Sequence, residues 1–483
     1  MLVVLFVIAV ILTVLVGVHW YVWRRLVRDT TVPGSAVRRA GTVAVVLLPL
    51  LSVGALVSGR AGAPFWLEQV LAWPGHLWLA TLLYLTLALV VAEGVRPLLR
   101  RALERRTDAR SGSGPAVATA AGADVTDATQ GGGSVTAASG VRPLEPVGPS
   151  SASAELGVPA AAAGRTDAAG SVAVDGGADA GVRPGGGVAT ADAPGAGTVT
   201  DVRDDARPEL SRRLFVARVA GGAAAAVAAG TVGYGTYGVM RGPRVKRVTV
   251  PLAKLARGAH GYRIAVVSDI HLGPVLGRAH AQRIVDTING TQPDLVAVVG
   301  DLVDGSVADL GRAAEPLAQL RARHGSFFVT GNHEYFSGAD AWVDHVRELG
   351  LTPLRNDRVE IAGFDLAGVD DIAGENEGQG PDFGRALGDR DRARAAVLLA
   401  HQPIVIDEAV RHGVDLQLSG HTHGGQLWPG NYIAELANPT VAGLERYGDT
   451  QLYVSRGAGA WGPPVRVGAP SDITVVELAS RQA

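Results

Sequence analysis

Five short polar clusters in the C-terminal half of the chain carry residue types that bind metal ions. They read Asp-Ile-His from position 269, Gly-Asp-Leu-Val-Asp from 300, Gly-Asn-His-Glu from 331, His401 alone, and Gly-His-Thr-His-Gly-Gly-Gln from 420. Carboxylate oxygens and imidazole nitrogens suit Mn, Fe or Zn better than Ca. The sequence contains no cysteine, which excludes thiolate ligands and cysteine nucleophiles. Any metal must therefore be held by nitrogen and oxygen.

This ligand set is larger than a single metal ion needs. Two ions about 3.5–4 Å apart, bridged by one carboxylate and a water molecule, would use all of the ligands. Such a pair stabilises hydroxide near neutral pH and neutralises charge on phosphoryl oxygens, as in-line attack at phosphorus requires. The pattern therefore predicts a phosphoesterase with two divalent metal ions as cofactors, either Mn, Fe or Zn.

Each polar cluster directly follows a short apolar run that is typical of a buried strand. The predicted strands are Tyr262–Ser268, Leu295–Val299, Ser326–Thr330, Ala396–Leu399 and Asp415–Leu418. Helix-like segments, among them residues 278–289 and 310–323, lie between these strands. Ligands of open α/β sheets collect at the carboxyl ends of the strands, so we expect the five clusters to meet at one site.

The motifs D-x-H, G-D-x-x-D, G-N-H-E, an isolated His and G-H-x-H occur in this order over roughly the last half of the chain. In this order they resemble the motifs of the calcineurin-like metallophosphoesterases. The G-H-T-H-G-G-Q form, behind N-terminal apolar segments, is similar to a bacterial membrane-associated branch often described as phosphodiesterases acting near lipids or the cell wall. The resemblance implies an α/β fold, a four-layered αββα metallophosphoesterase sandwich.

The resemblance also implies a role for each motif residue. One metal ion would be bound by Asp269, His271, Asp301 and His423, and the other by Asp301, Asn332, His401 and His421. Asp301 would bridge the two ions, and His333 would be the acid beside the leaving group. We interpret Asp304 as a carboxylate that orients a histidine ligand, although a capped turn is an equally good interpretation.

Each motif taken singly also has a plain structural interpretation. D-x-H is common in polar loops, G-N-H-E fits a turn, and an isolated histidine such as His401 is usually a packing residue. The full set, in order and at strand ends, is far more specific. Five other histidines lack this context, and we expect them at the surface: His260, His280, His324, His345 and His412.

The first half of the chain contains apolar stretches that are long enough to cross a hydrocarbon core as helices. They are Met1–Trp23, Ala40–Gly59, His76–Val95 and the less hydrophobic Val219–Met240. We expect the third to begin after Pro74 and to end near Pro97. A cleaved signal peptide is the alternative for the first, but a basic leader and a clear cleavage site are missing. Residues 211–215, Ser-Arg-Arg-Leu-Phe, resemble a twin-arginine export signal or form the basic flank of the fourth span.

Arginine placement predicts the orientation of these spans. Five arginines lie between spans one and two, and only Arg60 lies between spans two and three. Basic residues favour cytoplasmic loops, so the first loop is expected in the cytoplasm and residues after Met240 outside it. The predicted location is the cell membrane, with several spans and an extracytoplasmic catalytic domain.

These features divide the chain into four predicted domains. They are a membrane region with three transmembrane helices (1–106), a disordered Gly/Ala-rich linker (107–208), a fourth transmembrane helix or twin-arginine-like anchor (209–244) and a metallophosphoesterase domain (245–483). The linker cannot bury enough apolar area to offset its chain entropy. From Val245 onward, 22 Lys and Arg face 29 Asp and Glu, a net charge of −7, so no nucleic-acid partner is expected.

The predicted function is hydrolysis of a phosphoester by a hydroxide that bridges two metal ions, with phosphodiesters on extracytoplasmic or lipid-linked substrates favoured. The bilayer is the other expected partner. The alternatives are a nucleotide-sugar-lipid pyrophosphatase and a non-enzymatic membrane receptor or scaffold. The aromatic residues near the motifs would either wall the substrate site or belong to the core: Tyr335, Phe336, Trp428, Tyr432 and Trp461. Residues 372–392 are expected to form a flap or a surface loop.

Overall fold

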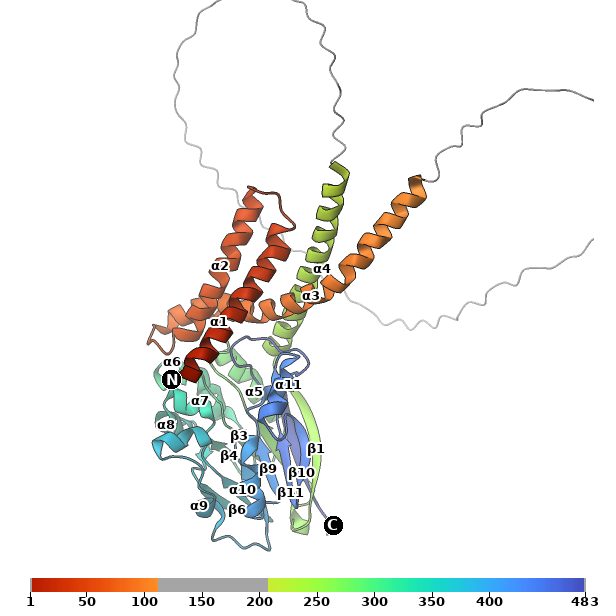
Figure 1. The fold of residues 1–483 in the computed structure, drawn as a ribbon. Coiled ribbons are helices and arrows are strands. Elements are labelled where there is room, and N and C mark those ends of the chain that lie inside the picture. Colours follow the sequence, from red (N-terminus) through yellow and green to blue (C-terminus); the bar gives the residue numbers. More distant parts are fainter. Residues whose placement is uncertain (1, 112–206, 482–483) are drawn as a thin grey trace, which may run out of the picture. The chain divides into compact units, whose positions relative to one another are not determined.

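The computed structural model describes residues 2–111 and 207–481 (Figure 1). Almost all of the predicted linker, residues 107–208, lies outside these ranges. Four helices in the described part are long and apolar enough to cross a membrane. They are α1 (Leu2–Val22), which continues as the π-helical η1 (Trp23–Arg28), α2 (Ala36–Val57), α3 (Phe65–Ser111) and α4 (Arg207–Met240). Helix α2 packs against α3, and α3 packs against α4.

Helix α3 is longer than the third predicted span. It begins at Phe65 and runs through Pro74 and Pro97, the residues that were expected to bound the span. Prolines are tolerated inside apolar helices when neighbouring helices supply compensating contacts. Here α2 is very close: a Cβ on Gly75 would lie 2.6 Å from the Leu51 carbonyl oxygen, and Ser52 Oγ donates to the Gly75 carbonyl at 2.7 Å. Because Gly75 has no side chain, α2 and α3 can approach this closely.

Two six-stranded sheets form the centre of the C-terminal domain (Figure 1). The first has the order β1 (Arg244–Leu252), β12 (Asp472–Ser480), β2 (Tyr262–Val267), β3 (Leu295–Val299), β4 (Ser326–Val329) and β5 (Thr352–Pro353). The second has the order β10 (Gly443–Tyr447), β11 (Thr450–Val454), β9 (Leu416–Ser419), β8 (Ala395–Leu399), β7 (Phe364–Gly368) and β6 (Asp357–Ile361). All five predicted strands are present, as β2, β3, β4, β8 and β9.

The central strands are buried on both faces, which explains their unbroken apolar sequence. In β3, Val299 packs into the core between the two sheets, whereas Val298 packs outward under helices. These outer helices are α5 (Arg278–Thr291), α6 (Val307–Ala314) and α8 (Ala339–Glu348). Helices α9 (Phe383–Leu387) and α10 (Ile406–Arg411) cover the second sheet in the same way. The order helix, sheet, sheet, helix confirms the predicted four-layered fold.

The segment of residues 372–392, expected to be a flap or a surface loop, contains the 3₁₀ helix η4 (Ile372–Glu377) and α9. Phe383 of α9 is buried in the outer core of the second sheet. Asn356, which precedes the segment, donates from its Nδ2 to the carbonyl of Gly380 within the segment at 2.9 Å. Next to Asn356, the Arg355 guanidinium donates to Asp370 at 2.6 Å. Part of this segment therefore belongs to the core.

Candidate metal centre

The structure brings all seven predicted metal ligands to one place. Three ligands follow strands of the first sheet directly: Asp269 and His271 follow β2, and Asp301 follows β3. Asn332 opens α7 (Asn332–Ser337) just after β4. The second sheet supplies the three others, because His401 follows β8, and His421 and His423 follow β9. The six His and Asp ligands, together with His333, form three overlapping groups in which the possible ligand atoms lie within 4.8 Å of one another.

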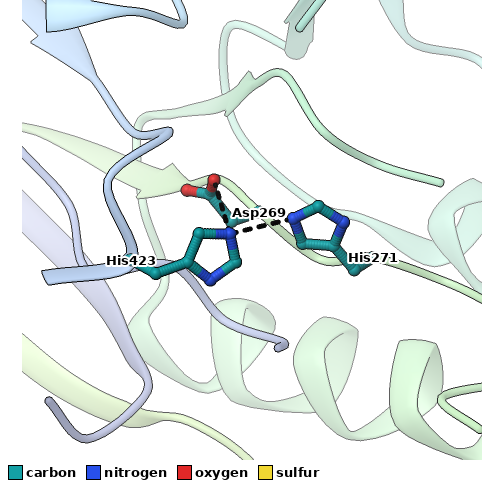
Figure 2. Close-up of side chains that lie close together, drawn as sticks. All are labelled: Asp269, His271 and His423. Atoms are coloured by element: carbon teal, nitrogen blue, oxygen red, sulfur yellow. Dashed lines mark hydrogen bonds and ion pairs between the residues drawn. The ribbon is translucent and has the colours of Figure 1, made fainter. Parts of the chain in front are cut away.

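The first group contains Asp269, His271 and His423 (Figure 2). His423 Nε2 lies 3.0 Å from His271 Nε2 and 3.4 Å from Asp269 Oδ1. All three residues are buried. Two imidazole nitrogens and a carboxylate that point at one another in a buried space make a nitrogen and oxygen donor set that suits Mn, Fe or Zn.

The second set of donors converges around Asp301. Its Oδ2 lies 3.1 Å from His401 Nε2 and 3.7 Å from His271 Nε2. Nearby, His421 Nδ1 lies 3.0 Å from Asn332 Oδ1. Asp301 therefore lies within 4 Å of a histidine from each of the two predicted ligand sets.

The backbone of these ligands is strained. Asp269, His271, Asp301, His421 and His423 all have positive φ angles, between 48° and 70°. Left-handed conformations cost non-glycine residues roughly 1–2 kcal/mol each. Only three other non-glycine residues among those described share this conformation. Strain of this kind persists where the surrounding structure enforces it and gathers at functional sites, so its concentration on the ligands supports a functional cluster.

Two motif glycines let the ligand loops pack against one another. A Cβ on Gly331 would collide with the Asp301 carboxylate and backbone nitrogen, and a Cβ on Gly420 would collide with the side chains of Ser268 and Asp269. Any larger residue would push these ligands apart. The glycines of G-N-H-E and G-H-x-H are therefore required by close packing.

Hydrogen bonds fix the orientation of the histidine rings. Asp304 Oδ1 lies 2.8 Å from His271 Nδ1 and 2.7 Å from His333 Nδ1. His401 Nδ1 donates to the Val299 carbonyl at 2.9 Å. A proton on Nδ1 leaves the Nε2 lone pair directed at the site, which is how outer residues commonly set a ligand histidine. The geometry therefore suits the role predicted for Asp304.

Two further residues support the site and were not identified from the sequence. Glu334 is fully buried, and its carboxylate accepts hydrogen bonds from the backbone nitrogens of Asp301 (3.0 Å), Leu302 (2.7 Å) and Gly331 (2.6 Å). It thus joins the loops after β3 and β4. The sequence does contain one signal for this role. Glu334 ends the G-N-H-E motif and is the third residue of α7, a position from which a glutamate side chain can bond back to the backbone before the helix.

Arg466 is the second such residue, and it supports His423. The buried guanidinium donates from Nη1 to the His423 carbonyl at 3.0 Å, and its Nη2 lies 3.1 Å from His423 Nδ1. Burial lowers the pKa of Arg466 to about 10, so the side chain stays charged at neutral pH. No local pattern marks this residue, since its motif partner lies 43 positions earlier.

The electrostatics of the cluster favour bound positive charge. Burial lowers the pKa of His271, but the carboxylates of Asp304 and Asp301 outweigh it and raise that pKa to about 9. Burial raises the pKa of Asp301, but the imidazoles of His401 and His271 hold it well below its usual range. Divalent cations would displace the imidazole protons and take over this role, so the donor set fits divalent metal ions.

The predicted acid, His333, lines a cavity of about 670 Å³ together with four of the predicted ligands, Asp301, Asn332, His421 and His423. Its ring lies between those of Phe336 and Trp461, with centroid distances of 5.5 and 5.9 Å. Both aromatic residues line the cavity, in agreement with one of the two sequence interpretations. Tyr335 is instead buried and donates from its hydroxyl to the Gln379 carbonyl at 3.0 Å, so it belongs to the core.

The expectation that five other histidines lie at the surface was wrong for His280. This residue is 1% exposed on α5, and neither ring nitrogen has a hydrogen-bond partner among the described residues. Burial lowers its pKa to about 3. The apolar face of α5 includes this position, and a neutral imidazole can be accommodated there. His260 is exposed, and His324, His345 and His412 are partly exposed.

The fold and the ligand cluster define a metal-binding αββα domain, and comparison with known proteins identifies its family. Residues 262–425 match the family model of calcineurin-like phosphoesterases. An uncharacterized metallophosphoesterase of Aquifex aeolicus is 37% identical over 49% of this chain and 91% of its own length. The uncharacterized metallophosphoesterase YkuE of Bacillus subtilis is 30% identical over 56% of this chain and 99% of its own length. The chain therefore belongs to the calcineurin-like metallophosphoesterase family.

A protein similar to this chain over part of its length occurs in zebrafish. The transmembrane protein with metallophosphoesterase domain of Danio rerio is 39% identical over 51% of this chain, and the match spans 59% of the zebrafish protein. The similarity therefore concerns about half of each chain. It supports the domain assignment, and it leaves the activity of the whole protein to be tested.

Proposed function

We propose that this protein is a membrane-anchored, metal-dependent phosphoesterase. The observation that carries the proposal is the convergence of the seven ligand residues, four of which line one cavity and five of which have a strained backbone with positive φ. One divalent ion would be held by Asp269, His271, Asp301 and His423, and a second by Asp301, Asn332, His401 and His421. When bound, such ions supply an activated water nucleophile and neutralise charge on the phosphoryl oxygens.

His333 is the proposed proton donor to the leaving group. Its Nδ1 lies 2.7 Å from the Asp304 carboxylate, so Nε2 is the nitrogen left to donate to the departing oxygen. The side chain is 15% exposed and borders the cavity, so a substrate can reach it. Asp304 holds the ring in place, which orients His333 to act as an acid.

The charge of the cavity favours a phosphodiester. Among the described residues that line the cavity there is no lysine or arginine. A diester carries a single negative charge that the metal ions can balance, whereas a terminal phosphate or a pyrophosphate brings additional charge with no basic side chain to meet it. A nucleotide-sugar-lipid pyrophosphatase and a non-enzymatic receptor are the alternatives.

The activity test uses the full chain in detergent with Mn²⁺ and bis-p-nitrophenyl phosphate, beside p-nitrophenyl phosphate and a nucleotide-sugar pyrophosphate. We expect two bound ions per chain by elemental analysis and preferred hydrolysis of the diester. Asp301→Asn should lose turnover and metal together, because it removes the shared charge, while exposed Asp344→Asn serves as the control. Metal-loaded wild-type protein without turnover would indicate a receptor. Preferred cleavage of the pyrophosphate would favour the alternative enzyme.

We also propose that α1–α4 span the membrane and that the domain faces the extracytoplasmic side. The length and hydropathy of the four helices support the spans. The arginines of η1 and of the first turn of α2 support the orientation. Single cysteines introduced at Val32, Ala61 and Asp449 in this cysteine-free chain test it. A membrane-impermeant thiol reagent on intact cells should label positions 61 and 449 and spare position 32. Labelling at position 449 only after lysis would place the domain in the cytoplasm.

A further inference from the structure

Helix α11 (Gly430–Ala437) presents an apolar surface beside the metal centre. None of its residues is buried, and Tyr432, Ile433 and Leu436 are 59%, 71% and 88% exposed. Positions 432, 433 and 436 share one face of the helix. Phe336 and Trp461, 67% and 56% exposed, flank the cavity. We call these five residues the apolar rim. Large apolar side chains gathered in this way on a surface mark an interaction site.

The apolar rim is continuous with a helix that is expected to span the membrane. Leu83 of α3 lines the same cavity as Phe336, Ile433 and Trp461. The next residue, Tyr84, donates from its hydroxyl to the Trp428 carbonyl at 3.0 Å, two residues before α11 begins. The side chain of Leu427 packs against the apolar cluster of the membrane helices. One wall of the cavity therefore comes from a helix that is expected to lie in the membrane, which places the cavity next to the bilayer.

The chemistry of the cavity is divided into two parts. Four of the proposed metal ligands and His333 contribute to its polar part, and Leu83, Phe336, Leu427, Ile433 and Trp461 form much of its apolar part. Within the described lining, Asp301 is the only acidic side chain and basic side chains are lacking apart from the histidines of the site. A ligand that matches both parts has one phosphate group and an apolar body. His333 lies at the boundary, between the rings of Phe336 and Trp461.

We propose that the apolar rim binds the acyl chains of a bilayer phospholipid while the phosphate of that lipid occupies the metal centre. This inference rests on the proposed phosphoesterase function and adds the substrate class. Hydrolysis would form a phosphorus–oxygen bond to water and break the one to the alcohol, whose oxygen takes a proton from His333. The proton released by water restores the acid, so the step balances. The lipid is attacked without leaving the bilayer.

The first test measures insertion of the apolar rim and does not depend on activity. Leu436→Cys is labelled with a bimane dye in the otherwise cysteine-free full chain, which is then placed in phosphatidylcholine vesicles. Ile404→Cys is the matched control, because Ile404 is 51% exposed and lies outside the lining of this cavity. Lipids with a nitroxide on the acyl chain should quench the label at 436 several-fold more than the label at 404. Equal quenching at both positions would overturn the inference, as would shielding at 436 that depends on protein density, which indicates a second copy of the chain.

The second test measures chain-length selectivity with Mn²⁺ present. Dioleoyl and dibutanoyl phosphatidylglycerol carry the same phosphodiester on long and short chains. In the double variant Ile433→Ser/Leu436→Ser, the ratio of kcat/KM for the long over the short lipid should fall about ten-fold or more, since apolar contacts with the long chains are lost. The ratio corrects for a general loss of activity. Ile404→Ser, which lies outside the cavity, should keep the wild-type ratio.

The two tests separate failure of the inference from failure of the proposed function. If bis-p-nitrophenyl phosphate is hydrolysed but neither lipid is, or if the ratio is the same in the double variant, the phospholipid assignment is wrong. If no phosphoester is hydrolysed by metal-loaded protein, the proposed function is wrong. In that case the quenching experiment still decides whether the apolar rim enters the bilayer.

Discussion

Replacement of Asp304 by asparagine tests how the site divides its work between metal binding and proton donation. One oxygen of this carboxylate lies 2.8 Å from His271 Nδ1 and 2.7 Å from His333 Nδ1. Burial alone would raise the pKa of Asp304, but the two imidazoles hold it below its usual range, so the group is ionised at neutral pH. Asn keeps the shape and removes the charge.

The expected magnitude follows from these two bonds. A hydrogen bond to a charged group contributes about 1.5–3 kcal/mol, and one between neutral groups about 0.5–1.5 kcal/mol. Each imidazole therefore loses roughly 1–1.5 kcal/mol of hydrogen-bond energy when the carboxylate becomes an amide. Loss of such an outer partner typically weakens metal binding 10–100-fold. At His333, the other imidazole, a loss of about 1.4 kcal/mol of this hydrogen-bond energy in the transition state lowers the rate roughly ten-fold when the leaving group needs a proton.

The assay separates the two losses. A Mn²⁺ titration of Asp304→Asn should show half-maximal activity at a 10–100-fold higher concentration than in wild type. At saturating Mn²⁺, kcat should remain about ten-fold lower for a phenyl phosphodiester and be nearly restored for its p-nitrophenyl counterpart, whose leaving group barely needs protonation. Asp344→Asn controls for the change of charge. An unchanged Mn²⁺ requirement together with equal losses on both substrates would refute the role given to Asp304.

Three further substitutions have distinct expected outcomes. His333→Ala should lower turnover about 10²–10⁴-fold on poor leaving groups with metal content nearly intact, and equal losses on all leaving groups would contradict the acid role. His280 has a pKa of about 3, against roughly 6.5 when unfolded, so its stabilisation is complete above pH 6.5 and is lost as the pH falls toward 3. Relative to His280→Leu, the wild type should therefore lose about 2 kcal/mol more stability between pH 8 and pH 5, measured from thermal unfolding. Glu334→Gln places an amide against backbone donors and should lower the free energy of unfolding by about 1–3 kcal/mol. An unchanged unfolding temperature would contradict its role in joining the loops after β3 and β4.

Much of the site could be predicted because its residues follow strands of a recognisable kind. The run from Leu295 to Val299 is apolar at every position, as a strand buried on both faces requires, and Asp301 comes two residues after it. The carboxyl ends of parallel strands in one sheet lie together, so local pattern predicts that the residues after β2, β3 and β4 meet, and likewise those after β8 and β9. That the two sets meet each other depends on how the two sheets pack, which the family resemblance implied and no local pattern shows.

The remaining features depend on pairings between distant parts of the chain. Strand β1 pairs with β12 in parallel, with Arg244 opposite Asp472, and no local signal specifies that partner. The buried state of His280 depends on what covers α5, and the path of α3 through Pro74 depends on its contact with α2. Arg466 likewise reaches His423 only after the fold has formed. Tertiary packing decides each of these cases.

The division of ligands between the two sheets links metal binding to the stability of the domain. Each proposed ion takes ligands from both sheets. For one ion, Asp269 and His271 of the first sheet face His423 of the second. For the other, Asp301 of the first sheet faces His401 of the second. Bound ions would therefore join the sheets and favour the folded state, by about 2.7 kcal/mol per site at a free ion concentration of one hundred times Kd. Mn²⁺ should raise the unfolding temperature of the chelator-treated wild type and raise that of Asp301→Asn much less. An equal rise in both proteins would mean that the ions bind elsewhere, because Asp301 is the one ligand that the two proposed sites share.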